Sequence, residues 1–171
     1  MAIRSYRCAF IQRALMTQPT MCFSVDTVKL SKYKNNFLKS SVGMDAIQAG
    51  ELSGDERLFM ALLDSNLLNS NIIPAQQKII RAGEQFDEAF IITNGEVLLS
   101  RGEKSFRLGP GAVIGLAEGM VGLPSRYSIA SLSALQVKVI QFHKVDTIVH
   151  QLPAELKSIL VTIIKRNLAP K

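Results

Sequence analysis

The chain has 171 residues, 47% of them hydrophobic, so it is long enough for one domain plus an extension and too apolar to be disordered throughout. No apolar run approaches the roughly 18 residues of a membrane span. The two cysteines, Cys8 and Cys22, both lie in the first 25 residues and so cannot cross-link the domain, which favours a reducing compartment. The net charge of +6 comes from residues 1–40, with seven basic residues and one acid, whereas residues 41–171 carry 13 of each. The part predicted to fold therefore lacks the basic surface typical of nucleic-acid binding.

Residues 1–40 are predicted to be a basic leader and linker with poor order. Residues 1–25 contain no acid, which is typical of a mitochondrial targeting sequence or a membrane-surface helix. Arg4 and Arg13 fall about half a turn apart on a helix, which weakens both interpretations, and Met16 and Met21 allow a later start of translation. We expect a cytoplasmic protein, and a mitochondrial or membrane-surface location stays open as the alternative.

A helix is predicted to begin at Ser53, because Ser53-Gly54-Asp55-Glu56 has the capping-box pattern of serine at the N-cap and glutamate three residues later. From residue 72 the pattern changes to short runs of β-branched and apolar residues. These runs are Ile72-Ile73, Ile79-Ile80, Phe90-Ile91-Ile92, Val97-Leu98-Leu99, Ala112-Val113-Ile114, Tyr127-Ser128-Ile129 and 135–142.

Turn signals separate these runs at residues 82–84, 93–95, 101–103 and 109–111. Asn94-Gly95 lies between two apolar runs and predicts a tight hairpin, because a type I′ turn needs positive φ at both central residues. The chain then closes in a helix after Pro153, with an apolar face from Leu156 to Ile164. Residues 41–171 are thus predicted to be mainly β with flanking helices, as an antiparallel, jelly-roll-like β-roll (a double-stranded β-helix) closed by C-terminal helices.

The glycine framework resembles that of the cyclic-nucleotide-binding domains, the β-roll family of the catabolite activator protein and the regulatory subunit of protein kinase A. The matching segments are Gly83-Glu84 followed by Phe90 to Val97, and Leu108 to Gly115. Arg126 lies eleven residues after Gly115, the spacing of the family's phosphate-binding arginine. The resemblance covers about residues 55 to 167 and implies a regulatory domain with no catalytic activity.

The resemblance also implies a ligand site, here called the cassette, over residues 115–128. In the family, backbone N–H groups at a short helix start and one arginine hold the cyclic phosphate. The cassette residues expected to form it are Gly115, Leu116, Ala117, Glu118, Arg126, Tyr127 and Ser128, with Val97 and Leu99 as the pocket wall.

The cassette departs from the family at two places. Leu116 stands where the family has a glutamate that accepts from the ribose 2′-hydroxyl, and an unpaired buried hydroxyl would cost about 1–3 kcal/mol. Core packing is the favoured interpretation of Leu116. Glu118, two residues on, is expected to be a helix-start or surface acid. Aligning the last strand backwards from Ile140 places Ser125, rather than Arg126, at the phosphate position. Tight binding of cAMP or cGMP in the usual mode is therefore not expected, and weak binding, another anionic ligand or a site closed by its own side chains stay open.

No catalytic or metal motif accompanies this scaffold. A metal site of the related cupin type needs two histidines one residue apart, whereas His143 and His150 are seven apart. The chain stops at Lys171, so we expect no DNA-reading helix-turn-helix and no DNA binding. We expect no cofactor and a possible cyclic nucleotide as ligand. The output is expected to pass through the 153–167 helix to a protein partner or a homodimer, and a ligand-free structural or adaptor protein is the alternative.

Overall fold

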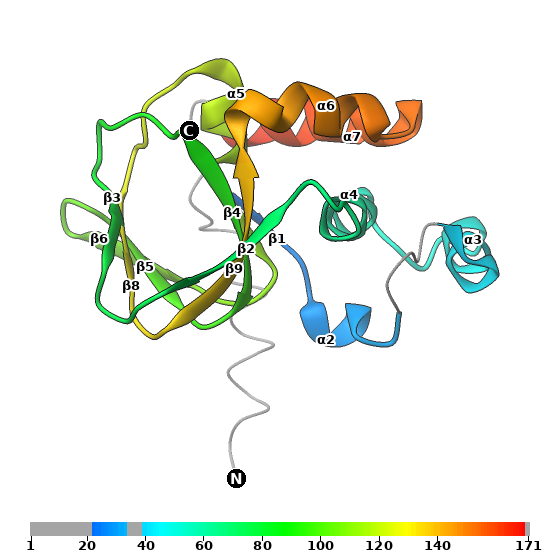
Figure 1. The fold of residues 1–171 in the computed structure, drawn as a ribbon, viewed down its shortest axis with the longest axis horizontal. Coiled ribbons are helices and arrows are strands. Elements are labelled where there is room, and N and C mark those ends of the chain that lie inside the picture. The colour runs from blue at the N-terminus through cyan, green and yellow to red at the C-terminus, as the bar shows by residue number, and fades with distance from the viewer. Residues whose placement is uncertain (1–21, 34–38, 170–171) are drawn as a thin grey trace, which may run out of the picture.

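The computed structural model describes residues 22–33 and 39–169 (Figure 1). Its strands are β1 (Cys22–Ser24), β2 (Asn69–Ile73), β3 (Lys78–Ile80), β4 (Glu88–Asn94), β5 (Val97–Arg101), β6 (Lys104–Leu108), β7 (Ala112–Ile114), β8 (Ser128–Ser131) and β9 (Leu135–Gln141). Its helices are α2 (Thr27–Leu30), α3 (Ser41–Gln48), α4 (Gly54–Leu63), α5 (Leu116–Val121), the 3₁₀ helix η2 (Phe142–Lys144), α6 (Val145–Gln151) and α7 (Ala154–Leu168).

The strands form two antiparallel sheets, which confirms the predicted β-roll. One sheet has the order β1-β7-β4-β9-β2 and the other the order β3-β8-β5-β6. In Figure 1 the sheets enclose the roll on one side of the molecule, and α5, α6 and α7 lie together beyond its edge. The closing helices expected at the C-terminal end are thus present.

The central strand β4 of the five-stranded sheet is buried on both faces, whereas the edge strand β2 is largely exposed. Along β4, Ala89 and Ile91 belong to an apolar cluster shared with the helices, which we call the helix-side cluster. Ile92 belongs to a second cluster inside the roll. Successive side chains of a strand point to opposite faces, so this alternation places the sheet between the roll interior and the helices. Burial of both faces explains why the sequence shows an unbroken apolar run at residues 90–92.

The prediction of a tight hairpin at Asn94-Gly95 is wrong. β4 pairs with β7 and β9, while β5 pairs with β6 and β8. The segment between β4 and β5 therefore carries the chain from one sheet to the other. Gly95 has a φ of 88°, and an added Cβ would collide with the backbone oxygen of Ala134. The tight hairpin lies instead between β5 and β6, where Arg101 pairs with Lys104.

The two helix predictions are confirmed. Ser53 caps α4, because its Oγ accepts from Glu56 N at 3.2 Å and the Glu56 carboxylate accepts from Ser53 N at 2.8 Å. Pro153 directly precedes α7. The apolar face of α7 packs onto its own domain, with Leu156 and Ile163 buried in the helix-side cluster. Among the described residues of α7, Val161 is the large hydrophobic side chain that stays exposed, at 49%.

Residues 22–33, which the sequence analysis assigned to the leader, pack into the fold. β1 adds an antiparallel strand beside β7, with Phe23 opposite Val113, and Phe23 is only 1% exposed. Leu30 of α2 is also buried in the helix-side cluster. The predicted linker at 31–36 is described only for residues 31–33. The leader's arginines, Cys8, Met16 and Met21 lie outside the described residues, and the division at residue 40 stays a prediction.

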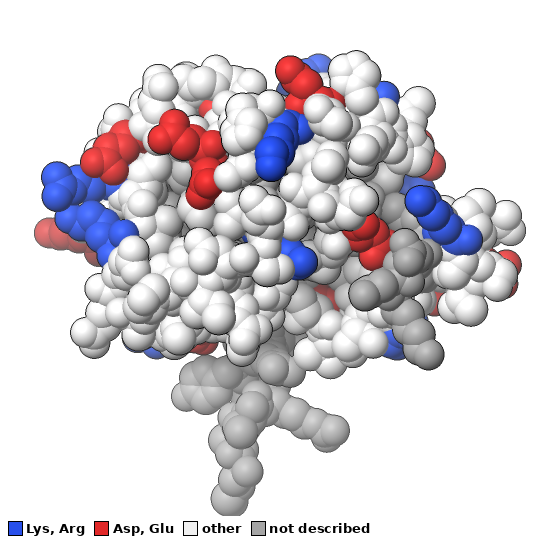
Figure 2. All heavy atoms as spheres, in the orientation of Figure 1, with Lys and Arg blue, Asp and Glu red and all other residues white. Residues whose placement is uncertain are grey.

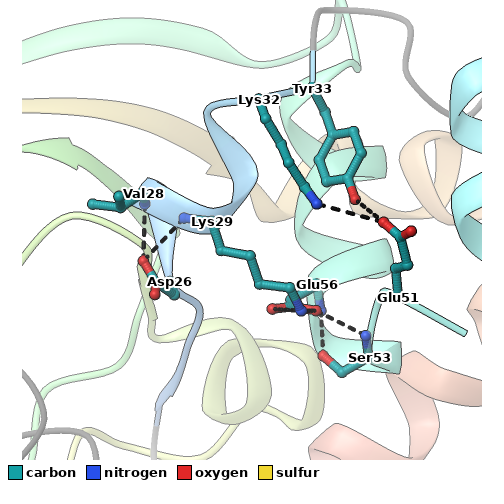
Figure 3. Close-up of polar contacts among 8 residues, drawn as sticks. All are labelled: Asp26, Val28, Lys29, Lys32, Tyr33, Glu51, Ser53 and Glu56. Atoms are coloured by element: carbon teal, nitrogen blue, oxygen red, sulfur yellow. Dashed lines mark hydrogen bonds and ion pairs between the residues drawn. The ribbon is translucent and has the colours of Figure 1, made fainter.

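Polar contacts fasten this segment to α4 and to the turn that precedes it (Figure 3). Lys29 Nζ lies 2.8 and 2.7 Å from the two carboxylate oxygens of Glu56. Glu51 Oε2 accepts from Tyr33 at 3.0 Å and from Lys32 at 3.4 Å. Glu56 is 8% exposed, so the Lys29 pair compensates a buried charge, whereas the Lys32 pair is in solvent. We call residues 22–33 the strap.

Candidate ligand-binding site

The cassette begins where β7 turns into α5 at Gly115. This residue has a φ of 78°, in the left-handed region that favours glycine. It also lies against the ring of Phe86, since an added Cβ would come within 2.6 Å of the Cδ1 and Cε1 ring atoms. Further along α5, Gly119 lies against the ring of Phe142 on η2 so closely that any side chain would collide with it. Two aromatic rings thus pack against the short helix, one at its N-cap and one near its middle.

Leu116 and Ala117 are core residues. They are 4% and 2% exposed, and Leu116 belongs to the helix-side cluster that contains Leu156 and Leu160 of α7. The preferred interpretation of Leu116 as a packing residue is therefore confirmed. Through Leu116, the cassette helix α5 packs against the closing helix α7.

Glu118 is the unexpected residue of the cassette. Its side chain is completely buried, and neither carboxylate oxygen has a hydrogen-bond partner. Burial raises the pKa of the Glu118 carboxyl to about 7, against the weaker opposing attractions of its own backbone N–H, which lies outside hydrogen-bond geometry, and of the positive charge of Arg126. The expectation of a helix-start acid is confirmed, because Glu118 lies in the first turn of α5. The alternative expectation of a surface acid is wrong, because α5 turns this side chain into the protein.

The segment 125–128 after α5 presents two buried and two half-buried side chains. Ser125 is 2% exposed, and its hydroxyl donates to the backbone oxygen of Tyr127 at 2.7 Å. Arg126 is half-buried and close enough to Glu118 for its charge to act there. Tyr127 is 8% exposed, and its ring packs edge-on against Phe106 at 5.8 Å between centroids. Ser128 Oγ accepts from the backbone N–H of Ala82 at 3.1 Å.

The expected pocket wall is lined by the protein's own side chains. Val97 and Leu99 are 1% and 0% exposed and share the cluster inside the roll with Phe86 and Tyr127. Two surface hollows stand out in the described part of the chain, and neither includes a cassette residue. One has a volume of about 280 Å³ between α4 and α7, and the other about 410 Å³ between α3 and the turn that follows α2.

Sequence reasoning missed Phe86 and Phe142 as site residues. Each holds a cassette glycine, but Phe86 lies 29 positions before Gly115 and Phe142 lies 23 after Gly119. The aromatic residues themselves are visible in the sequence. Their partners are not, because no local period or turn rule relates positions so far apart.

The two histidines lie outside the cassette. His143 is exposed on η2, and His150 Nδ1 is 2.7 Å from the backbone oxygen of Asp146 on α6. Within residues 22–33 and 39–169, no cluster of three or more histidine, cysteine or acidic side chains is placed to hold a metal ion. In the same residues no helix combines the length and hydropathy needed to cross a membrane.

The face of the molecule in Figure 2 carries basic and acidic side chains side by side. They are scattered over both the roll and the helices, with uncharged surface between them. This matches the equal numbers of acids and bases in residues 41–171. A face of this kind has no extended basic surface for a phosphate backbone.

No protein-family model matches the chain, and no curated protein matches it. Several solved structures share its fold. One, from work on a cyclic-GMP-dependent signalling pathway that regulates bacterial phytopathogenesis, is 18% identical, covers 69% of this chain and 91% of its own, and has a TM-score of 0.52. The catabolite activator protein of Thermus thermophilus is 16% identical over 67% of this chain and 54% of its own, with a TM-score of 0.51.

The EAL enzyme Bd1971 with cAMP bound is 21% identical over 57% of this chain, at a TM-score of 0.46, and only 28% of that longer protein is covered. The two structures with TM-scores above 0.5 confirm, at the level of fold, the resemblance predicted from the glycine framework. The chain has the fold of the cyclic-nucleotide-binding domains.

Proposed function

We propose that this chain is a non-catalytic regulatory domain that senses a cyclic nucleotide or a related anionic ligand at the cassette and signals through its C-terminal helices to a protein partner. The observation that carries the proposal is the position of α5, whose Leu116 packs in one cluster with Leu156 and Leu160 of α7. The cAMP- or cGMP-type ligand is suggested by the fold shared with regulatory proteins such as the catabolite activator protein.

The packing around α5 supplies the physical route for the signal. Gly119 touches Phe142, and η2 leads directly into α6 and then α7. Protein interiors are close-packed, so a shift of α5 cannot be absorbed without moving the groups against it. Tyr127, next to Arg126 in the chain, is buried inside the roll, so a ligand held by Arg126 is expected to shift the cassette segment. The expected response is a repositioning of α6 and α7.

Calorimetric titration with cAMP, cGMP and cyclic di-GMP tests the proposal. We expect saturable binding of one of them, weakened roughly ten- to a hundredfold by Arg126→Ala, because a hydrogen bond to a charged group contributes about 1.5–3 kcal/mol. Arg107→Ala, a change at an exposed arginine of β6, is the matched control and should bind normally. Faster hydrogen exchange in α7 on ligand addition would report the expected helix movement. No heat from any ligand, with circular dichroism showing folded protein, would overturn the proposal.

A ligand-free adaptor is the second candidate, and the self-filled cassette favours it. Phe86, Val97, Leu99 and Tyr127 share one cluster inside the roll, which leaves their space occupied without a ligand. Such a domain would act through its surface, including the exposed Val161 of α7. Sedimentation of the wild type against Val161→Asp tests this, with Thr162→Asp, at a neighbouring exposed position, as control. A dimer lost only in Val161→Asp supports pairing through the 153–167 helix, and a monomer in all three proteins contradicts it.

A further inference from the structure

Glu118 has no role in the phosphate contact proposed above, yet it is the fully buried acid of the cassette. α5 turns about 100° per residue, so Glu118 lies about 200° around the helix from Leu116. Leu116 faces the helix-side cluster with α7. Glu118 therefore lies on the opposite side of α5, where the charge of Arg126 reaches it.

The surroundings of Glu118 leave its carboxylate uncompensated. Both oxygens lack a hydrogen-bond partner, and a carboxylate in such a site pays for desolvation unless it is paired. Arg126 is the charged side chain that acts on the pKa of Glu118, and further charged and titratable residues lie on the elements around α5. They are Glu88 on β4, Arg81, Glu84 and Asp87 around Phe86, His143 and Lys144 on η2, and Glu155, Lys157, Lys165 and Arg166 on α7.

An anion bound to Arg126 would change the electrostatic environment of the Glu118 carboxylate. The positive charge of Arg126 favours an ionised Glu118 carboxylate, together with the backbone N–H of Glu118 itself, and a bound phosphate would offset the Arg126 contribution. Two negative charges in one buried site repel each other strongly. The pKa of Glu118 already lies near 7 in the ligand-free protein, so protonation at neutral pH costs little.

Resting on the proposed function, we propose that the cassette binds its anionic ligand together with one proton, which Glu118 takes up. The proton comes from solvent and forms an O–H bond on one carboxylate oxygen, and the ligand keeps its charge. The neutral acid no longer competes with the ligand for Arg126. Binding at the cassette thereby responds to pH as well as to ligand concentration.

The affinity of the cassette for its ligand should fall as the pH rises. Below pH 6 Glu118 is protonated before the ligand arrives, so affinity is at its maximum and independent of pH. Above pH 7 each further pH unit should weaken binding by about tenfold, because one proton must be taken up per ligand. A cyclic phosphodiester does not titrate in this range, so the slope belongs to the protein.

The experiment is calorimetric titration of the wild type with cAMP and cGMP from pH 6 to pH 8.5, in phosphate-free buffers of different ionisation enthalpy. We expect proton uptake approaching one per ligand above pH 8, and neither uptake nor slope in Glu118→Gln. Glu103→Gln, at an exposed turn position, is the matched control and should keep both. Affinity that is flat in the wild type, or a slope that survives in Glu118→Gln, overturns the inference.

Failure of this inference and failure of the proposed function are distinguishable. If the ligand binds with a flat pH profile, the proposed function stands and proton coupling is wrong. If neither nucleotide binds at any pH, the proposed function falls and the coupling falls with it. In that case urea unfolding from pH 5 to 8 shows whether Glu118 still titrates near neutrality without a ligand.

Discussion

Replacing Glu118 with glutamine isolates the cost of one buried acid. In the wild type the pKa of this carboxyl is about 7 in the folded protein, against 4.5 in the unfolded chain. The folded state therefore holds the proton more tightly than the unfolded state. The associated stability is fully present below pH 4.5 and is lost as the pH rises to 7. Each pH unit of pKa difference is worth about 1.4 kcal/mol, so the total is about 3 kcal/mol.

Urea unfolding at pH 5, 6, 7 and 8 measures this contribution. The free energy of unfolding of the wild type, minus that of Glu118→Gln, should fall by about 2–3 kcal/mol between pH 5 and pH 8. Taking the difference removes the other titrating groups, because both proteins share them. The glutamine amide brings its own unpaired buried atoms, which shift the difference equally at every pH. A difference that stays constant across the range would refute the burial argument for Glu118.

Three further predictions concern the strap and the cassette. Phe23→Ala should lower the free energy of unfolding by about 3 kcal/mol, because this ring is 1% exposed, and a thermal or urea melt showing no loss would return residues 22–33 to the leader. Lys29→Met should cost about 1 kcal/mol and Lys32→Met less than about 0.5 kcal/mol in the same assay, since only the first lysine pairs with a buried carboxylate; equal losses would contradict this ranking. Gly115→Ala should lower the free energy of unfolding more than Gly83→Ala does. The alanine at position 83 costs about 1–2 kcal/mol in left-handed backbone strain alone, whereas at position 115 the Cβ also meets the ring of Phe86. Similar melting temperatures for the two variants would show that the ring gives way.

The strap also packs beside the strand that leads into the cassette. β1 pairs directly with β7, the strand that leads into Gly115. Lys29 fastens the same segment to Glu56 on α4, as Figure 3 shows. Destabilising the strap is therefore expected to loosen the cassette. Faster hydrogen exchange of β7 in Phe23→Ala than in the wild type would report that connection.

The sequence by itself determined the features that depend on neighbouring residues. Alternating and continuous apolar runs predicted the strands, the Ser53–Glu56 pattern predicted the start of α4, and the glycine framework predicted the shared fold. These features follow from backbone φ, local hydrogen bonds and periodicity, which a short window of sequence contains.

Only the tertiary structure decided which strands pair and which groups are buried. Asn94-Gly95 has the composition of a hairpin turn, yet β4 and β5 lie in different sheets because each finds more favourable partners elsewhere. Phe23 and Lys29 look like parts of a basic leader until β7 and α4 are in place beside them. Glu118 resembles a surface acid until α5 is packed between the roll and α7. In each case the deciding energy comes from contacts between residues far apart in the chain, and no local pattern specifies them.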